Sequence, residues 1–190
     1  MIAPPAFEFD RSRLALSYDA SRLQQEIGDI VQGFPPYIHY SVIPLTEAAE
    51  RKVGVTDFSD PDWTTWVETP LLKRCAYINE VLNTLLCRKT NVRLLRLEPG
   101  GELKEHCDSQ LNLDFRKQIR LHVPVVTSPH VDFILNGKVV PLLPGELWYL
   151  RLSDPHSVCN NGQSERIQLS IDVVVNEWIE KMIVDGDASR

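Results

Sequence analysis

Apolar residues in the first half of the chain recur at helical spacing in two segments. The first predicted helix runs from Ser21, which can form a capping box with Gln24, to a stop at Gly33. Its apolar positions are Leu23, Ile27, Ile30 and Val31. The second begins at Thr69, followed by a proline at the first helical position. Its broad apolar stripe suits a helix packed on the outside of a sheet: Leu71, Leu72, Cys75, Ile78, Val81, Leu82, Leu85 and Leu86.

The segments around these helices lack helical periodicity. Residues 1 to about 16 are predicted to be an irregular or edge-strand lead-in, and residues 37–45 are predicted to be extended. Residues 46–66 are polar and mixed, which predicts a surface loop.

From residue 91 onward the pattern changes to short β-rich runs separated by turn signals. The Asn136-Gly137 pair between two such runs predicts a two-residue hairpin. Strands are predicted near 92–98, 102–107, 118–126, 131–135, 138–142, 147–151, 156–159 and 165–175. Such a run of strands with no helix between them favours a mainly β jelly roll or cupin-like barrel with flanking helices.

The length of 190 residues favours one domain. Residues 1–90 would form helical and extended support, residues 91–178 the barrel core, and residues 179–190 a tail. The net charge of −6 argues against nucleic acid or an anionic membrane as a partner. The N-terminus lacks a leader pattern, and none of the four cysteines forms a Cys-x-x-Cys pair, so we expect a cytoplasmic protein with reduced thiols.

Three residues form a candidate metal site. Residues i and i+2 of a strand point to the same face, so His106 and Asp108 can both face a barrel mouth. His156 follows fifty residues later on another predicted strand. Two histidines and one carboxylate make a facial triad that leaves three positions open on Fe(II), which can hold a bidentate 2-oxo acid and dioxygen.

Arg166 strengthens this interpretation. It lies ten residues after His156, on the next predicted strand. An arginine there can reach into the barrel and bind the far carboxylate of 2-oxoglutarate through its two-pronged guanidinium.

Several stretches also resemble a known family. They are RLEPGGELKEHCD, IRLHVPVVTSP, LPGELWYLRLSDPHSV and ERIQLSIDVV, within residues 66 to 178. The chain resembles the aspartyl/asparaginyl β-hydroxylase family, nearest its small-molecule branch that includes bacterial L-proline cis-4-hydroxylase. This resemblance implies a double-stranded β-helix and a dioxygenase that depends on Fe(II) and 2-oxoglutarate. Asp108 favours the small-molecule branch, because the protein-modifying members lack the carboxylate ligand.

The resemblance also implies residue roles. His106, Asp108 and His156 match the metal ligands, and Arg166 matches the residue that binds 2-oxoglutarate. Arg120 and His122 match a strand whose basic residues lie beside the cosubstrate; the alternatives are a surface salt bridge for Arg120 and a core histidine for His122. The resemblance assigns no role to Arg96, which lies on the strand leading to His106: it is a candidate for binding a substrate carboxylate, or it pairs with Glu98 or a nearby acid.

We therefore predict hydroxylation of an unactivated C–H bond in a free amino acid or a small amino-acid-derived metabolite. A second enzyme hypothesis is β-hydroxylation of Asp or Asn in a peptide, or of an amino acid bound to a carrier protein. It follows from the chain stopping at Arg190, soon after the last predicted strand, which would leave an open site. A third hypothesis, from another class, is a cupin-like binding module without turnover.

Overall fold

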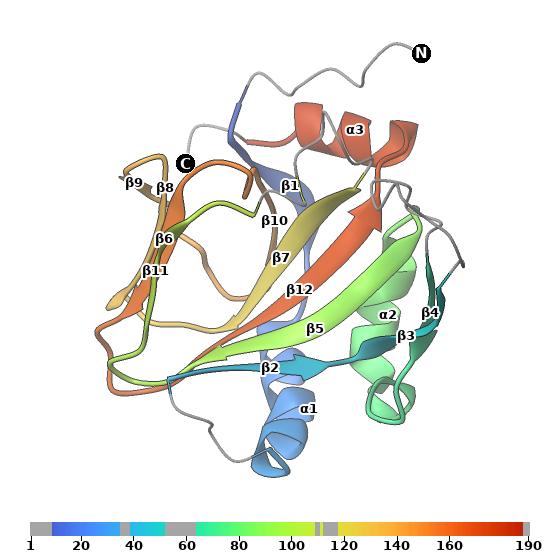
Figure 1. Ribbon diagram of the computed structural model, residues 1–190, viewed down its shortest axis with the longest axis horizontal. Helices are drawn as coiled ribbons and strands as arrows, with labels where there is room; N and C mark the ends of the chain where they lie inside the picture. The colour runs from blue at the N-terminus through green and yellow to red at the C-terminus, as the bar shows by residue number, and fades with distance from the viewer. Residues whose placement is uncertain (1–8, 35–38, 52–63, 109–110, 112–117, 188–190) are drawn as a thin grey trace.

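Two antiparallel sheets face each other in the computed structural model, which describes residues 9–34, 39–51, 64–108, 111 and 118–187 (Figure 1). The larger sheet has the order β1 (Arg11–Ser17), β10 (Glu146–Leu150), β7 (Gln118–Val126), β12 (Arg166–Val174), β5 (Lys89–Leu97) and β2 (Tyr40–Pro44). The smaller sheet has the order β6 (Glu102–His106), β11 (His156–Asn160), β8 (Val131–Leu135) and β9 (Lys138–Val139). This arrangement confirms the predicted jelly-roll class.

The larger sheet has one apolar and one polar face, and β12 shows the division most clearly. Its even-numbered positions face the smaller sheet: Arg166, Gln168, Ser170 and Asp172. Its odd-numbered positions belong to the main apolar core: Ile167, Leu169, Ile171 and Val173. Strand alternation therefore sends a polar row into the barrel and an apolar row towards the helices.

Helix α1 (Ala20–Gln32) covers the apolar face together with α2 (Ala76–Thr84) (Figure 1). The predicted stop at Gly33 is confirmed as the C-cap. The predicted capping box is wrong, because Asp19 is the N-cap. Its carboxylate accepts hydrogen bonds from the backbone N–H groups of Ser21 and Arg22, at 2.9 and 3.1 Å.

The second predicted helix is divided in two. A 3₁₀ turn, η2 (Leu72–Arg74), ends at Cys75, whose ψ of 85° leaves the helical region, and α2 starts at the next residue. The reason lies outside the segment. The carboxylate of Glu26 on α1 accepts hydrogen bonds from the N–H groups of Tyr77 and Ile78, at 2.9 and 2.8 Å. The first turn of α2 is thus capped by a carboxylate from α1, which starts a new helix at Ala76.

The segment predicted as a polar loop at 46–66 contains a hairpin of β3 (Thr46–Arg51) and β4 (Thr64–Glu68), with residues 52–63 outside the described part. Thr46 ties it to β5: its hydroxyl donates to the carbonyl of Thr90 at 2.9 Å and accepts from the N–H of Val92 at 2.8 Å. Polar hairpin residues contact solvent on both sides, so the alternation that identifies a strand is absent.

The predicted tail at 179–190 is also partly wrong, because α3 (Glu177–Val184) occupies its first half. Asn176 caps this helix by accepting from the N–H of Ile179, which is buried together with Ile183. The predicted hairpin turn is confirmed, since Asn136 and Gly137 have φ of 51° and 71°. No helix in the described ranges combines the length and apolar character that crossing a bilayer requires.

Candidate functional site

The three predicted metal ligands meet where the smaller sheet opens. His106 ends β6 and His156 begins β11, and they are direct cross-strand partners. Asp108 follows β6, where its backbone N–H donates to the carbonyl of Leu152 at 2.8 Å. One ligand atom from each of the three residues lies within 4.8 Å of the other two. The structure therefore brings together all three residues on one side of the barrel interior.

Backbone contacts orient both histidine rings. Nδ1 of His106 lies 2.7 Å from the carbonyl oxygen of Lys104, and Nδ1 of His156 lies 3.0 Å from that of Asp154. A carbonyl accepts only, so Nδ1 is the donor in each ring and Nε2 is the atom that can bind a metal. Burial lowers the pKa of His156, which favours the neutral form that a metal requires. This donor set of two imidazoles and one carboxylate fits Fe(II).

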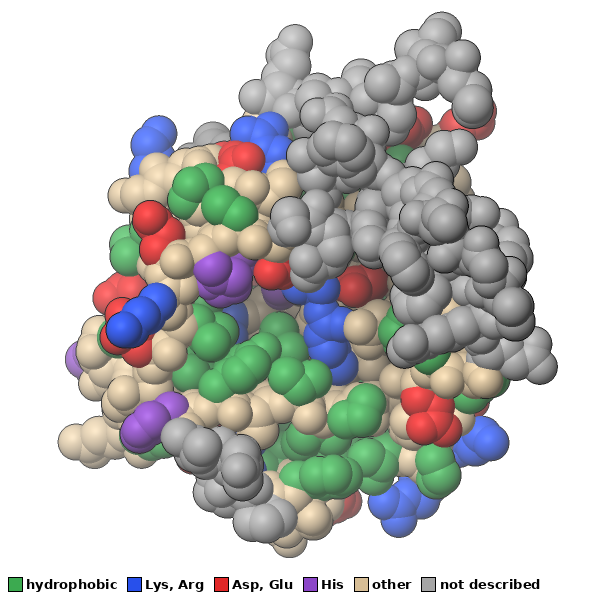
Figure 2. Space-filling model, in the orientation of Figure 1, with side chains coloured by type: hydrophobic (Ala, Val, Ile, Leu, Met, Phe, Trp, Pro, Cys, Tyr) green, Lys and Arg blue, Asp and Glu red, His purple; other side chains and the backbone are tan. Residues whose placement is uncertain are grey.

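A cavity of about 310 Å³ joins the triad to the polar face of the larger sheet. Figure 2 shows this face of the molecule hollowed near its centre, with basic, histidine and apolar side chains around the hollow. The lining beyond the triad comes from both sheets and includes Tyr40, Val42, Arg93, Leu95, Leu103, Arg120, His122, Phe133, Val158 and Arg166. Phe133 stacks on His156, with ring centroids 6.1 Å apart.

Arg166 is a buried cation without a countercharge. It is 4% exposed, and its guanidinium has no hydrogen-bond or ion-pair partner among the residues that the structure describes. Its Cζ atom lies 5.9 Å from the ring centroid of Phe133, the same ring that stacks on His156. Burial lowers the pKa of Arg166 to about 10, so the group stays charged at neutral pH. An unpaired buried guanidinium in a cavity is suited to a carboxylate ligand.

Arg120, in contrast, forms ion pairs with two carboxylates. It donates to Asp108 at 2.6 Å and to both carboxylate oxygens of Asp172 at 2.6 and 3.2 Å. Burial opposes its charge, but the two carboxylates outweigh that effect and raise its pKa. Arg120 therefore contacts a predicted metal ligand through one of these ion pairs, and its predicted place beside the cosubstrate stays a prediction.

His122 lines the same cavity, and its predicted place beside the cosubstrate stays a prediction. It is 2% exposed, and neither of its ring nitrogens has a hydrogen-bond partner within the described part of the chain. Burial, with the nearby Arg120 and Arg166, holds its pKa well below the usual value, so the ring is neutral. Gln168 and Ser170, on the same polar face, also have buried atoms to which no described residue offers a hydrogen bond. Buried polar groups are normally satisfied, so this cluster points to a polar ligand or ordered water.

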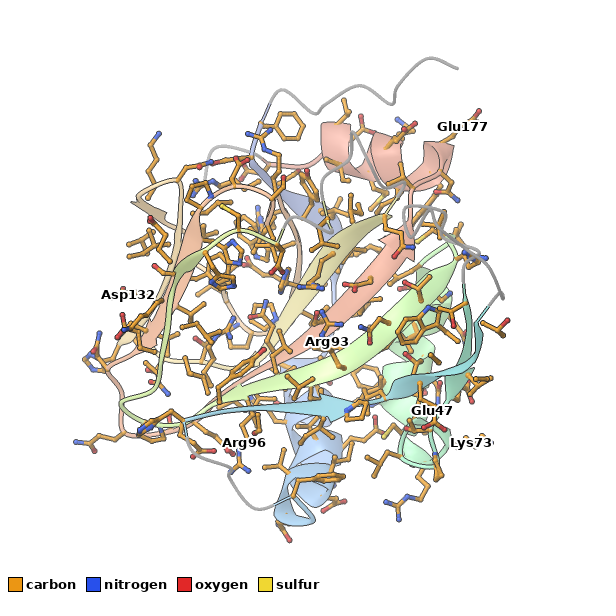
Figure 3. All side chains as sticks on the ribbon, viewed as in Figure 1. Glu47, Lys73, Arg93, Arg96, Asp132 and Glu177 are labelled. Atoms are coloured by element: carbon orange, nitrogen blue, oxygen red, sulfur yellow. The ribbon has the colours of Figure 1, made fainter. Side chains whose placement is uncertain are left out.

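Arg96 does not line the cavity. It faces the other side of β5, where its Nε lies 2.9 Å from the Glu98 carboxylate and close to that of Glu165, and where Nη1 donates to the carbonyl of Phe34 at 2.9 Å. The predicted role in substrate binding is therefore wrong, and the ion-pair alternative is confirmed. Arg93, three residues earlier, is the arginine of β5 in the cavity (Figure 3).

A second cavity, of about 360 Å³, lies on the other side of Arg166 and Phe133. Its walls are mostly apolar and come from residues 124–133 and 139–144, with Asp132 among them. None of the triad residues lines it. The cavity that holds the triad is therefore the candidate active site, although it is the smaller of the two.

Sequence reasoning missed Arg93 and Asp172. Asp172 carries a usable signal, since it is six residues after Arg166 on one strand and so shares its face. Arg93 lacks such a signal, because leucines occupy both faces of β5 near it. Its side is set by pairing with β12, which places it opposite Ser170.

Comparisons with known proteins identify a family and structures of similar fold. A family model described as aspartyl/asparaginyl beta-hydroxylase matches residues 62–175. An oxidoreductase of the 2OG-Fe(II) oxygenase family from Burkholderia pseudomallei superposes with a TM-score of 0.53 at 15% identity, over 83% of this chain and 80% of that one. HygX from Streptomyces hygroscopicus, solved with nickel and 2-oxoglutarate bound, gives 0.54 at 10% identity, over 89% and 84%.

At these identities the structural likeness establishes the fold, and the family match covers more than half of the chain. The narrower placement near L-proline cis-4-hydroxylase stays a prediction. The chain belongs to the aspartyl/asparaginyl β-hydroxylase family, and we assign it on that basis to the 2-oxoglutarate-dependent non-haem iron dioxygenases.

Proposed function

We propose that this protein hydroxylates a small substrate that carries a carboxylate, such as a free amino acid or an amino-acid-derived metabolite. The single observation that carries the cosubstrate part is the buried, unpaired guanidinium of Arg166 in the same cavity as the triad. When bound, Fe(II) and 2-oxoglutarate supply the oxidation: the C–H bond and dioxygen become C–OH, and 2-oxoglutarate becomes succinate and carbon dioxide.

Each group of residues in the cavity has a separate role in this proposal. His106, Asp108 and His156 hold the metal, and Arg166 binds the far carboxylate of the cosubstrate. Neutral His122 offers one donor and one acceptor to the polar groups between them. The apolar walls, Phe133 and Leu103 among them, limit the access of water.

Charge balance supports a substrate carboxylate. Three arginines face the site, namely Arg93, Arg120 and Arg166, and two carboxylates offset them, those of Asp108 and Asp172. The charges of a divalent cation and a dianionic cosubstrate cancel, so the site keeps one positive charge that a substrate carboxylate can balance. Arg93 is the arginine available to bind that carboxylate, because its contact with Asp172 is long, at 3.5 Å.

The first experiment is an anaerobic titration of the Fe(II)-loaded protein with 2-oxoglutarate, followed through the visible charge-transfer band. We expect the wild-type protein to give the band, and Arg166→Gln to lose it at the same ligand concentration. Arg96→Gln is the matched control, because it removes a buried arginine on the outer side of β5, and it should keep the band. Metal binding without a band in the wild type would rule out the cosubstrate assignment.

The second experiment tests the substrate class by screening amino acids for substrate-dependent succinate formation. With a substrate in hand, Arg93→Gln should raise its KM about tenfold or more, because a charged hydrogen bond is lost, and leave the KM for 2-oxoglutarate unchanged. An equal rise in both values would contradict a substrate role for Arg93.

A peptide or carrier-bound substrate is the second candidate. The observation that favours it is the His106 side chain, which is 43% exposed, so the metal edge opens to solvent. Turnover of an Asp- or Asn-containing peptide with no turnover of any free amino acid would establish this alternative.

A further inference from the structure

Asp172 is a buried carboxylate that contacts no predicted metal ligand directly. It lies on β12 opposite Arg120 on β7, and its side chain is 8% exposed. Two oxygens of its carboxylate bind the Nε and Nη2 edge of Arg120, at 2.6 and 3.2 Å. This two-point contact fixes the plane of the guanidinium.

The remaining edge of Arg120 carries this constraint to the metal site. Its Nη1 donates to Oδ2 of Asp108 at 2.6 Å. The other oxygen, Oδ1, lies 3.8 Å from Nε2 of His106, on the side where the ligand atoms gather. One oxygen of Asp108 is thus occupied by Arg120, and one remains for a metal.

We propose that Asp172 is a positioning residue, which acts through Arg120 to hold Asp108 as a one-oxygen metal ligand. This inference rests on the proposed metal role of the triad. Without Asp172, the guanidinium of Arg120 is free to turn and to pair with both oxygens of Asp108, so it competes with the metal. With Asp172 in place, Arg120 offers Asp108 a single donor.

A purely structural role explains the arrangement less well. Burying an ion pair gives little net stability compared with apolar side chains of similar size. Asp172 also attracts a second guanidinium, that of Arg93 at 3.5 Å, so it sits between two cavity arginines. It is joined to Asp108 by one intermediate residue, and removing either link should loosen the ligand.

The test is Co(II) binding to the full chain, measured by titration of the visible cobalt absorption. Asp172→Asn should weaken Co(II) binding about tenfold or more, the effect typical of residues that orient metal ligands. The cobalt bands should also shift, because the coordination of Asp108 changes. Asp132→Asn is the matched control: it makes the same chemical change on β8, in the wall of the second cavity, and should bind Co(II) within about twofold of the wild type.

Arg120→Gln separates positioning from general electrostatics. If Asp172 acts only through Arg120, the double variant Arg120→Gln/Asp172→Asn should bind Co(II) no more weakly than Arg120→Gln alone. Additive losses would overturn the proposal, and so would an Asp172→Asn protein that melts cooperatively and binds Co(II) like the wild type.

Asp172→Asn leaves two buried arginines with less countercharge, so it is paired with a charge-balanced variant. Arg93→Gln/Asp172→Asn removes one positive and one negative charge and keeps the contact of Arg120 with Asp108. It should bind Co(II) about tenfold more weakly than Arg93→Gln, and equal binding would overturn the proposal. A wild-type protein that binds no Co(II) would instead contradict the proposed function, so the two failures are distinguishable.

Discussion

The two faces of the larger sheet differ in what they contribute. The outer face packs against α1, α2 and α3 through aliphatic side chains that are almost fully buried. The inner face is equally buried on β7 and β12, yet there Arg166, His122, Gln168 and Ser170 have polar atoms without a partner among the residues that the structure describes. Unpaired buried polar groups cost stability, so the inner face is organised for a ligand, while the outer face supplies stability.

The largest expected effect lies on the outer face. Leu169 is fully buried between the sheet and the helices, so Leu169→Ala should lower the free energy of unfolding by about 3 kcal/mol, through lost burial and a cavity. Chemical denaturation measures this loss. Co(II) affinity of the folded protein should stay within about twofold of the wild type, since the side chain points away from the site. A much weaker metal affinity would show that the two faces are coupled.

An intermediate effect is expected from pH. The pKa of His122 is well below 6.5 in the folded protein, mainly because of burial, whereas the unfolded chain titrates near 6.5. Below pH 6.5 the unfolded state therefore binds more protons, and stability falls as the pH decreases. Between pH 7 and 5 this group should lower the free energy of unfolding of the metal-free protein, by at most about 2 kcal/mol.

Denaturation of the metal-free protein across this pH range measures the effect, with His122→Asn for comparison. The variant should show a smaller fall in stability, although His156, whose pKa is also lowered by burial, contributes in the same direction. Parallel curves for the two proteins would mean that His122 is not the buried neutral group described above.

The smallest effect is expected one residue from Leu169. Ser170→Ala removes a buried hydroxyl that has no partner, so the free energy of unfolding should stay unchanged or rise by up to about 1 kcal/mol. A loss of more than about 1 kcal/mol would show that the hydroxyl is satisfied by ordered water. With the expected outcome, truncation of Leu169 and of its neighbour Ser170 differs by about 3 kcal/mol or more in the free energy of unfolding, which measures the contrast between the two faces directly.

The sequence predicted most of this barrel because alternation is a local property. β7 and β8 lie at the predicted residues, and Arg120 and His122 share one face as expected. The errors come from contacts between distant segments. The start of α2 depends on Glu26, and the hairpin of β3 and β4 depends on Thr46 and its contacts with β5.

In the candidate site, too, local sequence patterns predicted some residues, while others depend on contacts between distant segments. The metal ligands and Arg166 were identifiable from residue type and spacing, and the structure brings them to one cavity. The choice between Arg93 and Arg96 required the register of β5 against β12, which places Arg96 opposite the apolar residue Ile167. Spacing along one strand does not contain that information.

The alternation of polar and apolar residues along β12 also determines what happens to a chain in which this strand pairs in the wrong register. A shift of one residue in its pairing would turn Arg166 and Asp172 into the aliphatic layer beside Leu23 and Ile27, and Leu169 into the cavity. The same register error would therefore disrupt both the apolar core and the candidate site. Molecules with this wrong register therefore stay unfolded and are exposed to proteolysis. Folded protein with an incorrectly built site does not accumulate, because the register that builds the site also builds the core.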